Sequence, residues 1–147
     1  MDLVRVFETY CLNNSIEFRY GSKAHLNLIE GDIDDDKIYL LLFPVRRGNS
    51  TGNLGLKIKE TNYSGNFFLL KGSNMDLHYF NERDQDEATS KFSVHIEPLI
   101  NTFKLLGNYL ACNEALDIVQ WGNIDAVDVL DANKDGLWCN YQINQDE

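Results

Sequence analysis

The clearest candidate for a metal site is the hexapeptide 131–136, which matches the first half of an EF-hand calcium loop. Such a loop needs oxygen ligands at positions 1, 3 and 5, a glycine at 6 and a bidentate Glu at 12. The first four requirements are met by Asp131, Asn133, Asp135 and Gly136. Position 12 is Gln142, whose neutral amide cannot hold the ion with two oxygens. Residues 137–143 then alternate at the period of a strand, so the pattern favours a hairpin turn over a calcium loop.

A second acidic run covers residues 30–36 and places acids at alternate positions. Carboxylate oxygens in such a run can hold a hard cation. However, Lys37 stands where a calcium loop would need glycine, and no Glu follows at the clamp position. We therefore interpret the run as a solvated acidic turn before a buried strand, and we expect neither a metal ion nor a cofactor.

No catalytic motif stands out among the three histidines, His25, His78 and His95. None is paired with a Ser, Cys or Asp in a nucleophile motif, and neither GxSxG nor HExxH occurs. The glycine-rich stretch 48–52 lacks the Lys-Ser/Thr of a phosphate-binding loop. The sequence therefore predicts a protein that is not an enzyme, with no catalytic residue.

One paired basic site, Arg46-Arg47, precedes a polar stretch that contains Asn49 and Ser50. At the end of a sheet, two arginines can bind a carboxylate or phosphate of a partner. These four residues are our candidate partner interface. The alternative is that the arginines are solvated and simply end a hydrophobic strand.

The composition predicts a folded chain of one domain, residues 1–147. Of its residues 44% are hydrophobic, with eight Phe, seven Tyr and two Trp. No apolar run is long enough to cross a membrane, and residues 1–5 do not form a signal peptide, so we expect a cytoplasmic protein. Three widely spaced cysteines with apolar neighbours predict buried free thiols: Cys11, Cys112 and Cys139.

The net charge of −10 disfavours sequence-specific or general nucleic-acid binding, which needs a basic surface. From Cys112 onward the chain has one base, Lys134, and eight acids: Glu114, Asp117, Asp125, Asp128, Asp131, Asp135, Asp146 and Glu147. Such a segment suits a basic partner or keeps an assembly subunit soluble.

Periodicity predicts the elements that position these residues. Apolar spacing predicts a helix over 3–12, with Asp2 as N-cap and Asn13-Asn14 as the stop. Strands are predicted at 17–20, 24–28, 37–46, 54–59 and 67–70, with a loop at 48–53 and a turn at 62–66. Residues 81–90 are predicted as a surface loop.

The second half is predicted to begin with a long helix over about 91–111, although residues 92–96 also alternate like a strand. Pro98 either begins this helix or kinks it. Strands at 116–121 and 125–130 follow, the second joined through the 131–136 turn to a strand at 137–144. The fold class is therefore α+β: an N-terminal helix, a mixed or antiparallel sheet, one long helix packed on it and a C-terminal β-hairpin.

This order of elements, ending in Asp135-Gly136-Leu137-Trp138, resembles the tail terminator (tail-completion) proteins of long-tailed bacteriophages and prophages. In that family an acidic turn with Gly-Leu-Trp can precede the final strand. Residues 68–77 and 96–131 also look like phage structural proteins. Residues 44–90 are longer than the compact family core.

The resemblance implies a structural virion protein that is assembled in the host cytoplasm. Such a protein forms an oligomeric ring, commonly a hexamer, that caps the tail tube and joins it to the head-tail connector in the neck. The alternative is a small acidic protein-binding module, or an inhibitor that acts by charge mimicry. That alternative would gather the C-terminal acids on one face.

Overall fold

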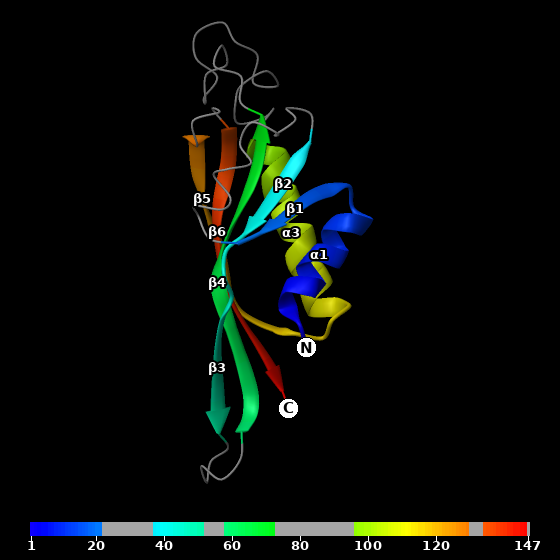
Figure 1. Ribbon diagram of the computed structural model, residues 1–147, viewed down its shortest axis with the longest axis vertical. Helices are drawn as coiled ribbons and strands as arrows, with labels where there is room; N and C mark the ends of the chain where they lie inside the picture. Colours follow the sequence, from blue (N-terminus) through cyan, green and yellow to red (C-terminus); the bar gives the residue numbers. More distant parts are fainter. Residues whose placement is uncertain (22–36, 52–57, 73–95, 130–133, 147) are drawn as a thin grey trace, which may run out of the picture.

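A computed structural model describes residues 1–21, 37–51, 58–72, 96–129 and 134–146 (Figure 1). Within these ranges the chain forms helices and strands in this order: α1 Leu3–Asn13, β1 Ile16–Tyr20, β2 Ile38–Leu42, β3 Arg46–Thr51, β4 Ile58–Gly72, α3 Glu97–Cys112, β5 Asp117–Val129 and β6 Lys134–Asp146. The predicted α+β class, with an N-terminal helix, a mixed sheet, a long helix and a C-terminal strand hairpin, is confirmed.

The sheet has six strands, in the order β1-β2-β4-β6-β5, with β3 also paired to β4. β1 and β2 are parallel, and the other pairs are antiparallel. β4 is long enough to pair with β2 through residues 67–70 and with β3 through residues 58–64. The half of the sheet around β3 therefore extends beyond the two helices (Figure 1).

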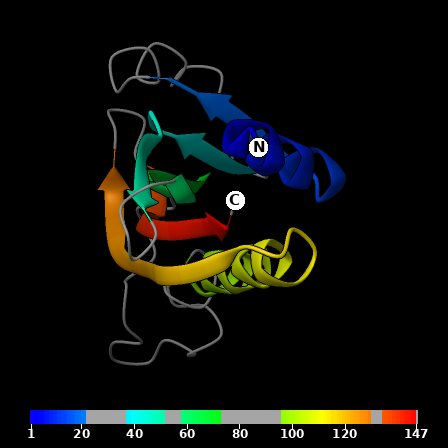
Figure 2. The same ribbon diagram turned by 90° about the horizontal axis from the view of Figure 1, so that it is seen from below.

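Both helices lie on the same side of the sheet, as the view from below also shows (Figure 2). Their apolar stripes meet the inward side chains of β2, β4 and β6 in the main core. The buried residues of this core include Leu3, Phe7, Cys11, Leu40, Leu42, Phe67, Leu69, Leu99, Phe103, Leu106, Leu110, Leu137, Cys139, Tyr141 and Ile143.

Local signals explain where both helices begin and end. The Asp2 side chain accepts a hydrogen bond from the Arg5 backbone N–H, which caps α1, and Asn14 is the C-cap. Pro98 stands in the first turn of α3, where its missing N–H costs nothing, so Pro98 begins the helix and does not kink it.

Two loop predictions in the middle of the chain are wrong. Residues 48–51 of the predicted 48–53 loop belong to β3, and the predicted turn at 62–66 lies inside the continuous strand β4. Asn, Ser and Gly favour turns locally. Here β3 and β6 lie on either side of β4 and satisfy its backbone groups, so tertiary pairing overrides that preference.

The two strands predicted at 116–121 and 125–130 are one strand, β5, which is interrupted by bulges near Val119 and between Ala126 and Val129. β5 and β6 form the expected antiparallel hairpin. The predicted strand at 24–28, the loop at 81–90 and the first residues of the 91–111 helix lie outside the described residues.

Candidate functional site

The calcium-loop hexapeptide does not have EF-hand surroundings. Asp131 and Asn133 lie outside the described residues, and Asp135 and Gly136 are in β6. β6 continues to Asp146, so a strand occupies the place of the helix that follows an EF-hand loop. The acidic run 30–36 and the three histidines also lie outside the described residues.

Metal-ligating side chains do not gather in the part of the chain that the structure describes. No group of three or more His, Cys, Asp or Glu there is placed to hold an ion. The candidate interface residues Arg46, Arg47, Asn49 and Ser50 are all described, and they lie on β3.

The strand pleat sends Arg46 and Arg47 to opposite faces of the sheet. Arg47 is opposite Tyr63, which belongs to the core on the helix side, while Arg46 is opposite Ser64 on the other face. The two guanidinium groups therefore cannot form one clamp. Both arginine side chains are exposed, and their strand, β3, forms an edge of the described sheet beside β4.

Asn49 and Ser50 join β3 to β4 through side-chain hydrogen bonds. Thr61 Oγ1 donates to Asn49 Oδ1 at 3.3 Å, and Asn62 Nδ2 donates to Ser50 Oγ at 2.9 Å. These bonds fix the register of the β3–β4 arm (residues 46–51 and 58–64). The alternative that the arginines end a hydrophobic strand is not what the structure shows, since they begin a separate one.

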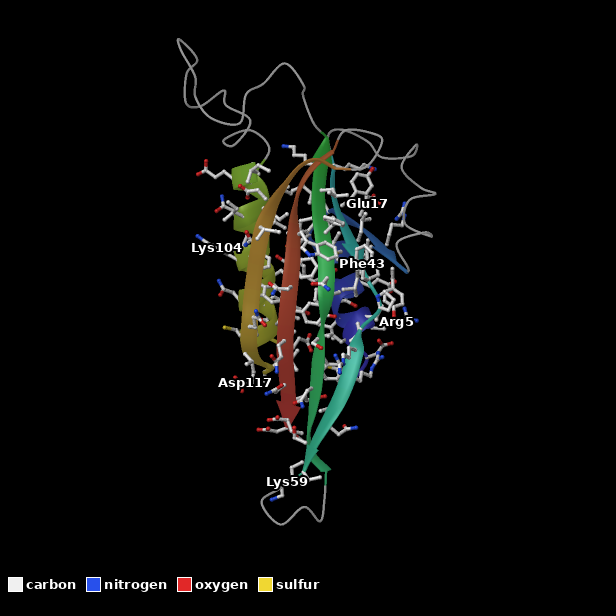
Figure 3. All side chains as sticks on the ribbon, turned by 90° about the vertical axis from the view of Figure 1, so that its left-hand side faces the viewer. Arg5, Glu17, Phe43, Lys59, Lys104 and Asp117 are labelled. Carbon is white, nitrogen blue, oxygen red and sulfur yellow. The ribbon has the colours of Figure 1, made fainter. Side chains whose placement is uncertain are left out.

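The face of the sheet opposite the helices, here called the open face, carries no helix among the described residues (Figure 3). An aromatic cluster lies on it: the ring centroids of Phe68 and Trp138 are 4.4 Å apart, and those of Phe43 and Trp138 are 5.3 Å apart. Ile124 is opposite Trp138 and is 65% exposed. Sequence reasoning did not find this cluster, because it depends on both helices packing on the other face.

Beside the aromatic cluster, the open face carries a row of uncharged polar side chains. β4 and β6 place these residues opposite one another: Asn62 with Asn144, Ser64 with Gln142, and Asn66 with Asn140. Oδ1 of Asn62 and Oδ1 of Asn144 are buried without a hydrogen-bond partner. The open face therefore combines apolar rings and amides, which is chemistry that suits a protein contact.

A groove of about 540 Å³ lies between α1 and β1. Its charged groups are largely paired: Glu17 is 3.6 Å from Arg19 and 3.5 Å from Lys37. Cys11 also lines the groove, and burial raises the pKa of its thiol to about 12. A nucleophilic cysteine has a lowered pKa instead, so this groove lacks an activated thiol.

Two of the three cysteines are buried, as predicted, but Cys112 is exposed. Cys112 is the last residue of α3 and comes after Leu110, the last buried position of the helix, so its side chain faces solvent.

We expect one thiol per chain to react rapidly with a chromogenic thiol reagent at neutral pH. Burial raises the pKa of Cys11 from 9.0 to about 12 and also raises that of Cys139. For Cys11 the shift lowers the thiolate fraction about a thousandfold. A Cys112→Ser variant should lose the fast phase, and the unfolded wild type should show all three thiols. A fast phase that survives Cys112→Ser would contradict the burial of the other two.

The C-terminal acids that the structure describes are not gathered on one face. Asp117, the first residue of β5, is opposite Asn144 on the face away from the helices, whereas Asp125 is opposite Leu137, whose side chain belongs to the main core on the helix side. Burial raises the pKa of the Asp125 carboxyl. This spread does not favour the charge-mimic alternative.

Comparison with known proteins gives no relative on which to base an assignment, because no family model, curated protein or solved structure matches this chain. Of the helices in the described residues, neither has both the length and the hydropathy of a membrane span. The function must therefore be argued from the surfaces of the molecule itself.

Proposed function

We propose that this protein is a structural subunit of a phage tail or neck. It acts as a tail terminator whose ring caps the tail tube and joins it to the head-tail connector. The observation that carries the proposal is the sheet itself. Helices cover one of its faces, and its β3–β4 arm extends beyond them (Figure 1).

The surfaces of the described residues support assembly. Aromatic rings and amides share the open face, and the arm presents exposed Arg46, Arg47 and Asn49. Aromatic and arginine side chains are enriched in protein interfaces. The element order supports the more specific proposal, because it resembles the layout of the tail terminator family.

The test is the size and shape of the purified protein. We expect light scattering to give a mass that is a multiple of 16.9 kDa, about six times that value for a hexamer, and negative-stain micrographs to show rings. The second measurement is co-sedimentation with polymerised tail tubes, because a subunit of this kind can stay monomeric until it meets the tube. A protein that is monomeric at every concentration and also ignores tail tubes would refute the proposal.

A further inference from the structure

Two strands in the arm half of the described sheet have one unpaired edge each. β3 pairs only with β4, and the beginning of β5 pairs only with β6. Each free edge presents a row of backbone N–H and C=O groups that can pair with another strand. The two edges lie on opposite sides of the same sheet, so one molecule carries both halves of a possible contact.

The directions of the strands fit such a contact between copies. β3 is antiparallel to β4, β4 to β6, and β6 to β5. β3 and β6 therefore run one way, while β4 and β5 run the other. If a second copy continues the sheet, its β5 meets β3 in antiparallel orientation, with the bonds perpendicular to the strands.

The charges of the two edges are complementary. Arg46 and Arg47 are exposed on β3, and neither makes an ion pair with another described residue. Asp117, the first residue of β5, is exposed and lies at the beginning of that strand (Figure 3). Val119, two residues after Asp117 on β5, is 53% exposed. A β3–β3 or β5–β5 contact would instead bring like charges together, which is unfavourable.

The register also brings these residues to the same level of the sheet. Gly48 is opposite Asn62, Asn62 is opposite Asn144, and Asn144 is opposite Asp117. In a closed ring, neighbouring copies are not shifted along the ring axis. If that axis runs along the strands, Asp117 of one copy lies opposite Gly48 of the next. Because the pairing is antiparallel, Arg46 is then opposite Val119 and diagonal to Asp117 on the same face of the sheet, while Arg47 is opposite Ile118 on the other face.

We propose that β3 of one copy pairs antiparallel with the beginning of β5 in the next copy, with Arg46 diagonal to Asp117 on the open face. The partner is a second copy of this chain, and the contact is heterologous, so it closes into a ring when the rotation closes. The inference rests on the proposed ring and names the surface that builds it.

Charge reversal tests the pairing. We expect Arg46→Glu to raise the concentration needed for ring formation several-fold, and Asp117→Lys to do the same. Combining the two substitutions should restore rings. The matched control is Lys104→Glu, which reverses an exposed charge on α3 and not on either edge strand, and should leave ring formation unchanged.

Disulfide trapping tests the geometry independently. Opposed residues of an antiparallel pair have Cα atoms about 4.5–5.5 Å apart, within the range that a disulfide spans. A Gly48→Cys protein and an Asp117→Cys protein, both carrying Cys112→Ser, should form covalent dimers when mixed and oxidised, and neither should do so alone. A β-carbon at Gly48 meets no atom within 4 Å, so the first variant should fold.

The outcomes separate this interface from the proposed function. Rings that form normally with reversed charges, and that give no trapped dimers in the mixture, would overturn the interface but leave the ring function standing. Trapped dimers from a single variant alone would also overturn it, since they require like edges to meet. A wild type that forms no ring and binds no tail tube would overturn both.

Discussion

Phe67→Ala is expected to lower the free energy of unfolding by about 3–5 kcal/mol, because it removes the central ring of the main core. Phe67 is 0% exposed. Its ring centroid lies 5.6 Å from those of Phe7 and Trp121 and 6.1 Å from those of Phe103 and Tyr141. One side chain thus joins α1, α3 and three strands, so the cavity left behind cannot easily collapse. Urea unfolding would measure the loss, and the melting temperature should fall by roughly 10–15 °C.

The neighbouring Phe68 provides a matched control. It is the same residue type on the same strand, but the pleat places it on the open face, where it is partly buried against Phe43 and Trp138. We expect Phe68→Ala to cost only about 1–2 kcal/mol. Equal losses for the two variants would mean that the helices do not seal the main core, and would contradict the arrangement described above.

The sequence predicted those elements whose signals are local. The apolar spacing after Asp2 and the period of residues 137–143 both gave the correct element, because each segment has one face toward the core. The prediction of a turn at residues 62–66 was wrong because Asn62, Ser64 and Gly65 are residue types that favour turns. These residues form a strand because they pair with β3 and β6, and the local sequence does not reveal that pairing.

The candidate interface was only partly accessible to sequence reasoning. The polar residues 46–50 were identified, but their treatment as one basic site was not correct, because it required them to share a face. Only after β3 is placed beside β4 does the pleat separate Arg46 from Arg47. Asp117, the proposed acidic counterpart, had no local signal at all, since it becomes an edge residue through the order of the strands.

The contrast between local sequence signals and strand pairing also underlies the second large predicted loss of stability. Gly136→Ala is expected to lower the free energy of unfolding by about 2–3 kcal/mol. The sequence interpretation assigned this glycine to a sharp turn, yet it lies in β6 opposite Leu70, and among described glycines only Gly21 has a positive φ. A β-carbon at Gly136 would come within 2.4 Å of the Leu69 backbone oxygen and of Leu70 Cδ2. Close approach of two central strands, and not turn geometry, therefore requires glycine here.

Two other strand glycines provide matched controls for Gly136→Ala. At Gly48 an added β-carbon meets no atom within 4 Å, so Gly48→Ala should be neutral or gain about 0.5 kcal/mol. At Gly122 it would meet Asn140 Oδ1 at 2.8 Å, the movable end of a side chain, so Gly122→Ala should lose less than Gly136→Ala. Denaturant unfolding of the three variants would rank them. A Gly136→Ala protein as stable as Gly48→Ala would mean that β4 and β6 are further apart at this point, and that residue 136 is tolerant of side chains as a solvated turn would be.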